Sequence, residues 1–193
     1  MRRSLTVALA AGAVIGATLA PAAAFASTGP VSHRAARTAP NSAGGDPNTT
    51  MTFTVTVGGL TMTAPGAANI GSGAPGTTIS GPLGTVTVTD ARALISASWT
   101  ATASSTNFTT GGGTPAETIP ATDANYNPGP ITTTGTITAT GSDITLSNAA
   151  QTVVAGTAGS GDNTASWDPT IAVAVPATAV GGLYTATLTQ SVS

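Results

Sequence analysis

The chain has 193 residues and a formal net charge of −2, and charged residues make up only 6% of it. It contains no Lys and no Cys. A surface this poor in cations cannot neutralise a phosphate backbone, so we expect no nucleic-acid partner and no binding to anionic lipid. The absence of Cys excludes disulfides and thiol catalysis.

The first 26 residues have the pattern of an export signal. Arg2 and Arg3 form a charged start, residues 5–19 form an apolar core, and Ala24-Phe25-Ala26 fits the small-x-small rule for cleavage. The apolar core is shorter than the roughly 20 residues that span a bilayer, and no later segment is long and apolar enough to do so. We therefore expect a signal peptide over 1–26, a secreted protein that is extracellular or cell-wall associated, and no membrane contact after cleavage.

Residues 27–48 have the composition of a flexible linker. Pro30, Pro40 and Pro47 lie here together with Gly44-Gly45, and large apolar residues are few. The linker also holds His33, the only His of the chain, so a Ser–His–Asp triad in the following domain would have no base. One His and no Cys exclude an ordinary zinc site.

The remaining residues, 49–193, consist of short alternating segments separated by Gly and Pro. The first is predicted to be a hairpin, in which 51–57 and 60–63 are joined by a Gly58-Gly59 turn. Further strands are expected at 77–80, 84–89, 94–103, 107–110, 131–140, 143–147, 151–156, 169–175 and 182–192. No long stretch has helical periodicity. The sequence predicts one all-β domain, an antiparallel two-sheet β-sandwich with an immunoglobulin-like look.

Alternation also predicts the surface of this domain. In the segments 84–89 and 182–192, Thr alternates with apolar residues, which places hydroxyls rather than charges on one face of each strand. A weakly charged, hydroxyl-rich surface suits contact with sugars or a hydrated wall. The alternative is that Thr only satisfies strand propensity.

The large aromatic residues are candidates for a sugar-stacking platform. Trp99, Trp167, Tyr126 and Tyr184 supply most of the aromatic surface of a chain with only 4% aromatic residues. In such a chain, large aromatics more often anchor the core. Trp99 lies in an alternating strand, which favours the core, whereas Trp167 stands at a loop-to-strand junction and is the better candidate for exposure.

Arg92 is the only cation of residues 49–193. It is a candidate ligand-binding residue, since a guanidinium binds a carboxylate of a sugar acid or peptide bidentately. Asp90 stands two residues earlier and shares its face if the strand continues. A structural Asp90–Arg92 pair is therefore the competing interpretation, and the one we favour.

The carboxylates predict neither an active site nor a metal site. A glycosidase needs two carboxylates facing each other across a cleft, whereas Glu117 and the Asp residues are scattered over turn-like positions. Residues 123–129 copy the start of a calcium loop, but Pro128 and Thr134 occupy the places where such a loop needs Gly and a bidentate acid. An Asx-type turn is the preferred interpretation. We expect no enzyme activity, no metal and no cofactor.

Two segments carry a family resemblance. Residues 86–92, Val-Thr-Val-Thr-Asp-Ala-Arg, followed by Trp99-Thr-Ala and Phe108, resemble the N-terminal half of the WxL domain of Gram-positive surface proteins. Residues 179–189 resemble the final strand of that domain, and the likeness runs in order over about 50–193. The chain departs from the family pattern in two places. The first motif reads Trp99-Thr-Ala, with Ala where the family has Leu, and Gln190 replaces the second Trp. The Ala-rich leader and Lys-free chain are typical of a high-GC actinobacterial relative.

The resemblance implies a function for the domain 49–193. A WxL-like protein is expected to be a secreted, non-catalytic module that associates non-covalently with the bacterial cell wall, through peptidoglycan or another wall glycan. One alternative is a structural or adhesive subunit that self-assembles or binds other surface proteins, since strand edges without Lys are poorly guarded against pairing. A glycan-processing enzyme is the weakest alternative.

Overall fold

The structure is a computed structural model, and it describes residues 49–193. The expected signal peptide (1–26) and linker (27–48) lie outside the described residues. Thr52–Ser193 forms one compact unit. Its regular structure is β strands with two single 3₁₀ turns, so the predicted all-β class is confirmed. Within residues 49–193, no helix has the length and apolar character needed to cross a bilayer.

The strands are short except for two. The elements in chain order are β1 (Leu60–Thr63), β2 (Thr78–Pro82), β3 (Val86–Ser105), β4 (Phe108–Thr109), η1 (Pro115–Glu117), β5 (Thr118–Ile119), η2 (Ala121–Asp123), β6 (Ala124–Asn127), β7 (Ile131–Thr134), β8 (Thr138–Gly141), β9 (Ile144–Thr145), β10 (Gln151–Trp167), β11 (Thr170–Ala174) and β12 (Leu188–Val192).

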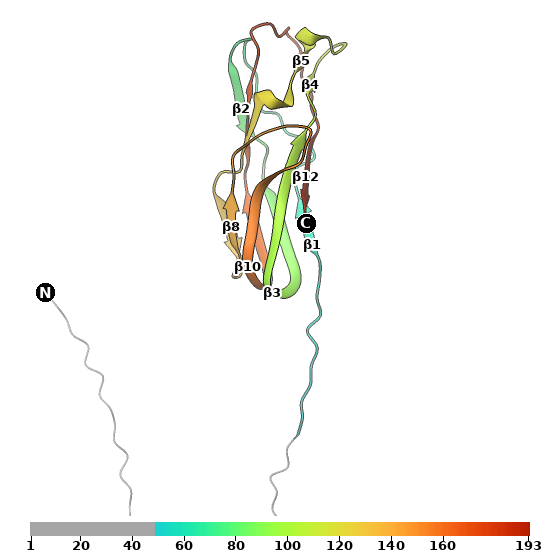
Figure 1. The fold of residues 1–193 in the computed structure, drawn as a ribbon, viewed down its shortest axis with the longest axis vertical. Helices are drawn as coiled ribbons and strands as arrows, with labels where there is room; N and C mark the ends of the chain where they lie inside the picture. Colours follow the sequence, from blue (N-terminus) through green and yellow to red (C-terminus); the bar gives the residue numbers. More distant parts are fainter. Residues whose placement is uncertain (1–48) are drawn as a thin grey trace, which may run out of the picture. The chain divides into compact units, whose positions relative to one another are not determined.

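The two long strands, β3 and β10, pair antiparallel along nearly their whole lengths. Both turn back at one end of the domain, the lower end in Figure 1. Ala93, Ser96 and Ala158 have positive φ angles there, and the register of the ladder shifts several times between Gly156 and Asn163. Such irregularities let a β ribbon bend sharply. One sheet therefore contributes strands to both layers of the domain.

The other strands complete two antiparallel sheets. In the first sheet, β1 and β12 pair with β3, whereas β7 and β8 pair with β10. The second sheet has the order β2-β11-β6-β9, and β4 and β5 form a separate short pair. The β2–β11 ribbon continues the β3–β10 ribbon, and the Leu83 N–H donates to the Pro169 carbonyl (2.8 Å) at the junction. The two sheets pack against each other, as predicted for a sandwich.

The core lies between these layers. It contains small and branched apolar side chains from facing strands together with both Trp residues. Three polar side chains are buried, those of Asp90, Ser105 and Asn163, and Asn163 is 2% exposed. Its Oδ1 accepts the N–H groups of Thr136 (2.8 Å) and Ile137 (3.1 Å), and its Nδ2 donates to the Gly161 carbonyl (2.9 Å). Asn163 therefore fixes the β7–β8 turn against β10.

The predicted hairpin at 51–63 is wrong. Only β1 forms, and it pairs with β3 rather than with 51–57. The Gly58 N–H donates to the Ala91 carbonyl (2.7 Å), and the Ala91 N–H donates to the Gly59 carbonyl (2.9 Å), so both glycines extend the β1–β3 ladder. A Cβ on Gly58 would lie 2.8 Å from the Cβ of Ala91. Glycine is therefore present for close approach of two strands and not for a turn.

Some strand boundaries also differ from the sequence-based expectation. The segments 84–89 and 94–103 belong to one strand, β3, and 131–140 is split into β7 and β8. β6 forms within the segment 123–129, which resembles the start of a calcium loop in sequence. It pairs with β11, which places Tyr126 opposite Ile171 inside the sandwich.

Candidate functional site

Three of the four predicted site residues lie in the core. Trp99 on β3 is 3% exposed, Trp167 on β10 is 2% exposed, and Tyr126 on β6 is fully buried. The expected exposure of Trp167 is therefore wrong, because its strand continues across Pro169 into β11 and keeps its inward face covered. Their rings contact protein rather than solvent, so a sugar-stacking platform would require the layers to separate.

Two of these aromatics are joined by hydrogen bonds. The Nε1–H of Trp167 donates to the Tyr126 hydroxyl (2.9 Å), and that hydroxyl donates to Oε1 of Gln190 (3.1 Å). Burial raises the pKa of Tyr126 to about 12, although the hydrogen bond from Trp167 acts in the opposite direction. Gln190 therefore accepts a hydrogen bond from a buried phenol and links β12 to the second sheet.

Arg92 is held by a carboxylate at the bend of β3. Its Nε and Nη2 donate to the two oxygens of Asp90 (both 2.8 Å), and Nη2 also donates to the Ser98 carbonyl (2.8 Å). The Asp90 side chain is fully buried and that of Arg92 is 28% exposed. The hydrogen bonds from Arg92 hold the pKa of Asp90 below its usual value, and the reciprocal bond raises the pKa of Arg92. This geometry fixes the bend and commits the Nε and Nη2 groups of the guanidinium to protein acceptors.

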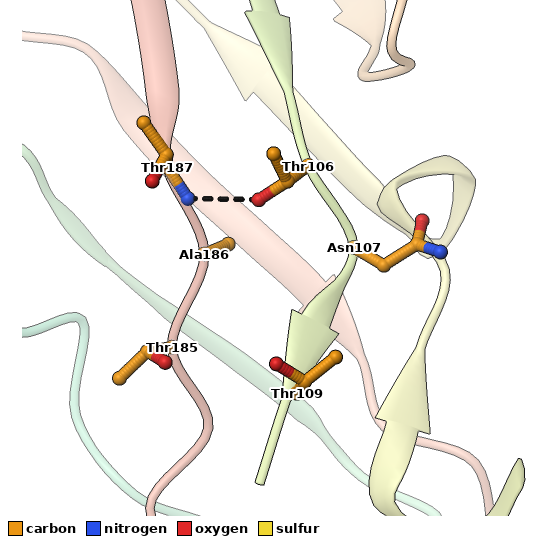
Figure 2. A pocket seen from close by; sticks show the side chains of 6 residues that line it. All are labelled: Thr106, Asn107, Thr109, Thr185, Ala186 and Thr187. Atoms are coloured by element: carbon orange, nitrogen blue, oxygen red, sulfur yellow. Dashed lines mark hydrogen bonds between the residues drawn. The ribbon is translucent and has the colours of Figure 1, made fainter. Parts of the chain in front are cut away.

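A surface pocket of about 410 Å³ lies between the segment at β4 and the segment before β12. Its lining residues are Thr106, Asn107, Thr109, Thr185, Ala186 and Thr187. Backbone hydrogen bonds in both directions (3.0 Å each) join Thr109 to Thr185, and the Thr187 N–H donates to the Thr106 hydroxyl (2.9 Å). Figure 2 shows the side chains of Thr109 and Thr185 at the same level of the two neighbouring segments. All six lining residues are exposed, and none carries a charge.

The amide of Asn107 points away from this pocket (Figure 2). Its Oδ1 accepts the Ala121 N–H (3.0 Å) and so fixes the turn η2 beside the pocket. The pocket therefore presents hydroxyls on two backbone segments that hydrogen bonds hold in place. Thr185-Ala-Thr187 belongs to the WxL-like ending, but no sequence signal paired this segment with 106–109, because the two lie far apart in the chain.

A larger cavity of about 840 Å³ opens between the loop 65–73 and the segment 180–188. Its wall is mostly apolar and includes Ile70, Ile79, Phe108, Val173, Leu183 and Leu188. None of its lining residues is charged. We refer to it as the apolar groove. The hydroxyl pocket and the apolar groove share the segment 185–187 as a common wall.

Two of the acidic side chains considered for catalysis or metal binding, Glu117 and Asp143, have local partners. The carboxylate of Glu117 accepts the N–H (3.0 Å) and hydroxyl (2.8 Å) of Thr114, which lowers the pKa of Glu117. The side chain of Asn127 accepts the Gly129 N–H (2.7 Å), which is an Asx-type turn, and donates to Asp143 (3.0 Å). In the described part of the chain, no three His, Cys, Asp or Glu side chains gather as metal ligands would.

Comparisons of the chain with family models, with curated proteins and with solved structures returned no match. The resemblance to the WxL domain therefore rests on the sequence segments at 86–92, 99–108 and 179–189.

Proposed function

We propose that this chain is a secreted, non-catalytic module of the bacterial surface that associates non-covalently with a wall glycan. The observation that supports this most directly is the uncharged, hydroxyl-lined pocket beside β4. Each Thr hydroxyl is both a donor and an acceptor, which matches the mixed hydrogen-bonding pattern of sugar hydroxyls. A few fixed polar groups on a rigid wall are typical of ligand recognition.

The electrostatics of the domain agree with a neutral ligand. Arg92 is its only cation and is already paired with Asp90. The pKa of Glu117 is lowered, whereas a glycosidase acid needs a raised pKa to carry a proton at neutral pH. The glycan strands of peptidoglycan, which are rich in hydroxyl and amide groups, are therefore the favoured part of the ligand.

Co-sedimentation with purified peptidoglycan tests this proposal. Thr109→Val and Thr185→Val together remove two hydroxyls of the pocket and keep the β-branched shape of both side chains. The matched control, Thr133→Val with Thr138→Val, makes the same change at exposed positions on β7 and β8. We expect wild type and control to pellet with the wall and the pocket variant to stay in the supernatant. Wild-type protein that stays wholly in the supernatant would refute the proposal.

A further inference from the structure

The large exposed apolar side chains of the described residues fall in two groups. The first group lies in the segment before β1 and at the bend of β3, and the second lies on the rim of the apolar groove. The first group is Met51, Phe53, Val55, Val57, Leu94 and Ile95, and the second is Val180 and Leu183. Exposed apolar side chains that gather in one region mark interaction sites.

Residues 52–57, which we call the arm, precede β1, belong to no strand, and alternate apolar residues with Thr. Phe53 is 91% exposed, and Val55 and Val57 are 68% and 69% exposed. They alternate with Thr, and six extended residues reach about 20 Å. Because the β1–β3 ladder holds Gly58 and Gly59, the arm does not fold back into a hairpin. It leaves the domain at the end where β3 and β10 turn (Figure 1).

The apolar groove has the shape and chemistry that such a strand needs. It runs beside β12, and its lining includes residues of β2, β4 and β5, which lie at the end of the domain opposite the bend (Figure 1). The arm and the groove lining both lack charged residues, so inserting one into the other would bury no unpaired charge.

β12 pairs with β3 on one side only, and β1 lies close to β12 without forming a strand pair with it. Ser193 and Thr100 exchange hydrogen bonds in both directions (2.8 and 3.1 Å), so the antiparallel alternation directs the backbone groups of Thr189 and Ser191 toward β3 as well. The intervening residues, Leu188 and Gln190, direct their N–H and C=O groups outward. In the described chain, no strand pairs with that side of β12.

We propose that the arm of one copy adds as a strand along β12 of a second copy, with Phe53, Val55 and Val57 in the apolar groove. Backbone hydrogen bonds would supply affinity, and side-chain insertion would set the register. Because arm and groove lie at opposite ends of the domain, the contact is head to tail, and its repetition builds a ring or an open chain of copies. This inference does not depend on wall binding.

Measuring the self-association of purified wild type and variants tests the role of the arm. Each protein is produced from the full sequence. Phe53→Asp with Val55→Asp places charges on the apolar face of the arm. The matched control, Thr54→Asp with Thr56→Asp, places the same charges on the other face. Both pairs are exposed, so folding is expected to persist. By sedimentation velocity, we expect wild type and control to form oligomers that depend on concentration. We expect the Phe53/Val55 variant to associate at least about tenfold more weakly than wild type.

Cysteine crosslinking tests the groove, since the chain has no native Cys. One chain carries Val55→Cys and a second carries Leu183→Cys, and the pair is mixed under mild oxidation. We expect a disulfide-linked heterodimer, and none when Thr133→Cys replaces Leu183→Cys. A wild type that stays monomeric at high concentration would overturn the proposal. So would preferential linkage of Val55→Cys chains to one another, because that result would place arm against arm.

Discussion

The Trp167–Tyr126–Gln190 chain gives the sharpest prediction about stability. Replacing Tyr126 with Phe keeps the buried ring but removes the hydroxyl that accepts the Trp167 N–H. Trp167 is 2% exposed, so its N–H is left without a partner. An unsatisfied buried donor costs about 1–3 kcal/mol of unfolding free energy. The partly exposed Gln190 amide can recover a bond to water and adds little.

Urea denaturation of wild type and variants measures this loss. With an m-value of about 1–3 kcal/mol/M, a loss of about 2 kcal/mol lowers the midpoint by about 1 M. Tyr184→Phe is the matched control. The Tyr184 hydroxyl donates to the carbonyls of Ala116 (3.1 Å) and Val180 (2.9 Å), so its removal leaves no buried donor unpaired. We expect a smaller loss there, and a loss below about 0.5 kcal/mol for Tyr126→Phe would refute the reasoning.

The same side chain predicts a pH dependence. Burial raises the pKa of Tyr126 to about 12 from 10.0. The folded state favours the protonated phenol. The contribution of Tyr126 to the unfolding free energy is therefore complete below pH 10 and disappears as pH rises through about 12. The stability difference between wild type and Tyr126→Phe should therefore narrow over that interval. A difference that stays constant would place the phenol in contact with water.

The remaining predictions concern the bend and the core. Gly156→Ala would place a Cβ 2.7 Å from ring atoms of the buried Trp99, so we expect the unfolding free energy from urea denaturation to fall by about 1–3 kcal/mol. Gly59→Ala is the control, because its Cβ would meet nothing within 4 Å and should leave the unfolding free energy nearly unchanged. The lowered pKa of Asp90 means that its contribution is present at pH values above 3.8 and is lost as the carboxylate protonates at lower pH. Asp90→Asn, which breaks the pair with Arg92, should therefore lower the Tm at pH 7 and lose this acid sensitivity, and equal melting temperatures at pH 7 would contradict that role.

Alternation was enough to predict most of the strands, because a half-buried strand repeats every two residues whatever its partner. It was not enough to predict the bend. Ala93, Ser96 and Ala158 adopt positive φ angles without the Gly or Asn that usually signals such backbone. The tertiary pairing of β3 with β10 imposes these conformations, so the sequence suggested two separate strands where the fold has one folded ribbon.

For the candidate site, the sequence predicted the hydroxyl character of the surface but not the residues that form the pocket. Thr-rich alternation indicated a hydroxyl surface, and the structure has one at Thr109 and Thr185, which only the tertiary fold brings together. The Gly58-Gly59 pair predicted a hairpin turn, so the exposed arm was not predicted. The sequence alone does not distinguish a glycine required for close strand packing from one required for a turn. Trp167 was expected at the surface because nothing in the sequence indicates that Pro169 lies inside a continuous layer.

Direct mapping of the ligand by NMR tests the central claim. Soluble peptidoglycan fragments are titrated into isotope-labelled protein, and the amide shifts of residues 106–109 and 185–187 are followed. We predict saturable shifts concentrated at these positions, which disappear in the Thr109→Val/Thr185→Val variant. Saturating fragments that leave these amides unmoved, or that shift only residues at the bend of β3, would contradict a glycan site in the hydroxyl pocket.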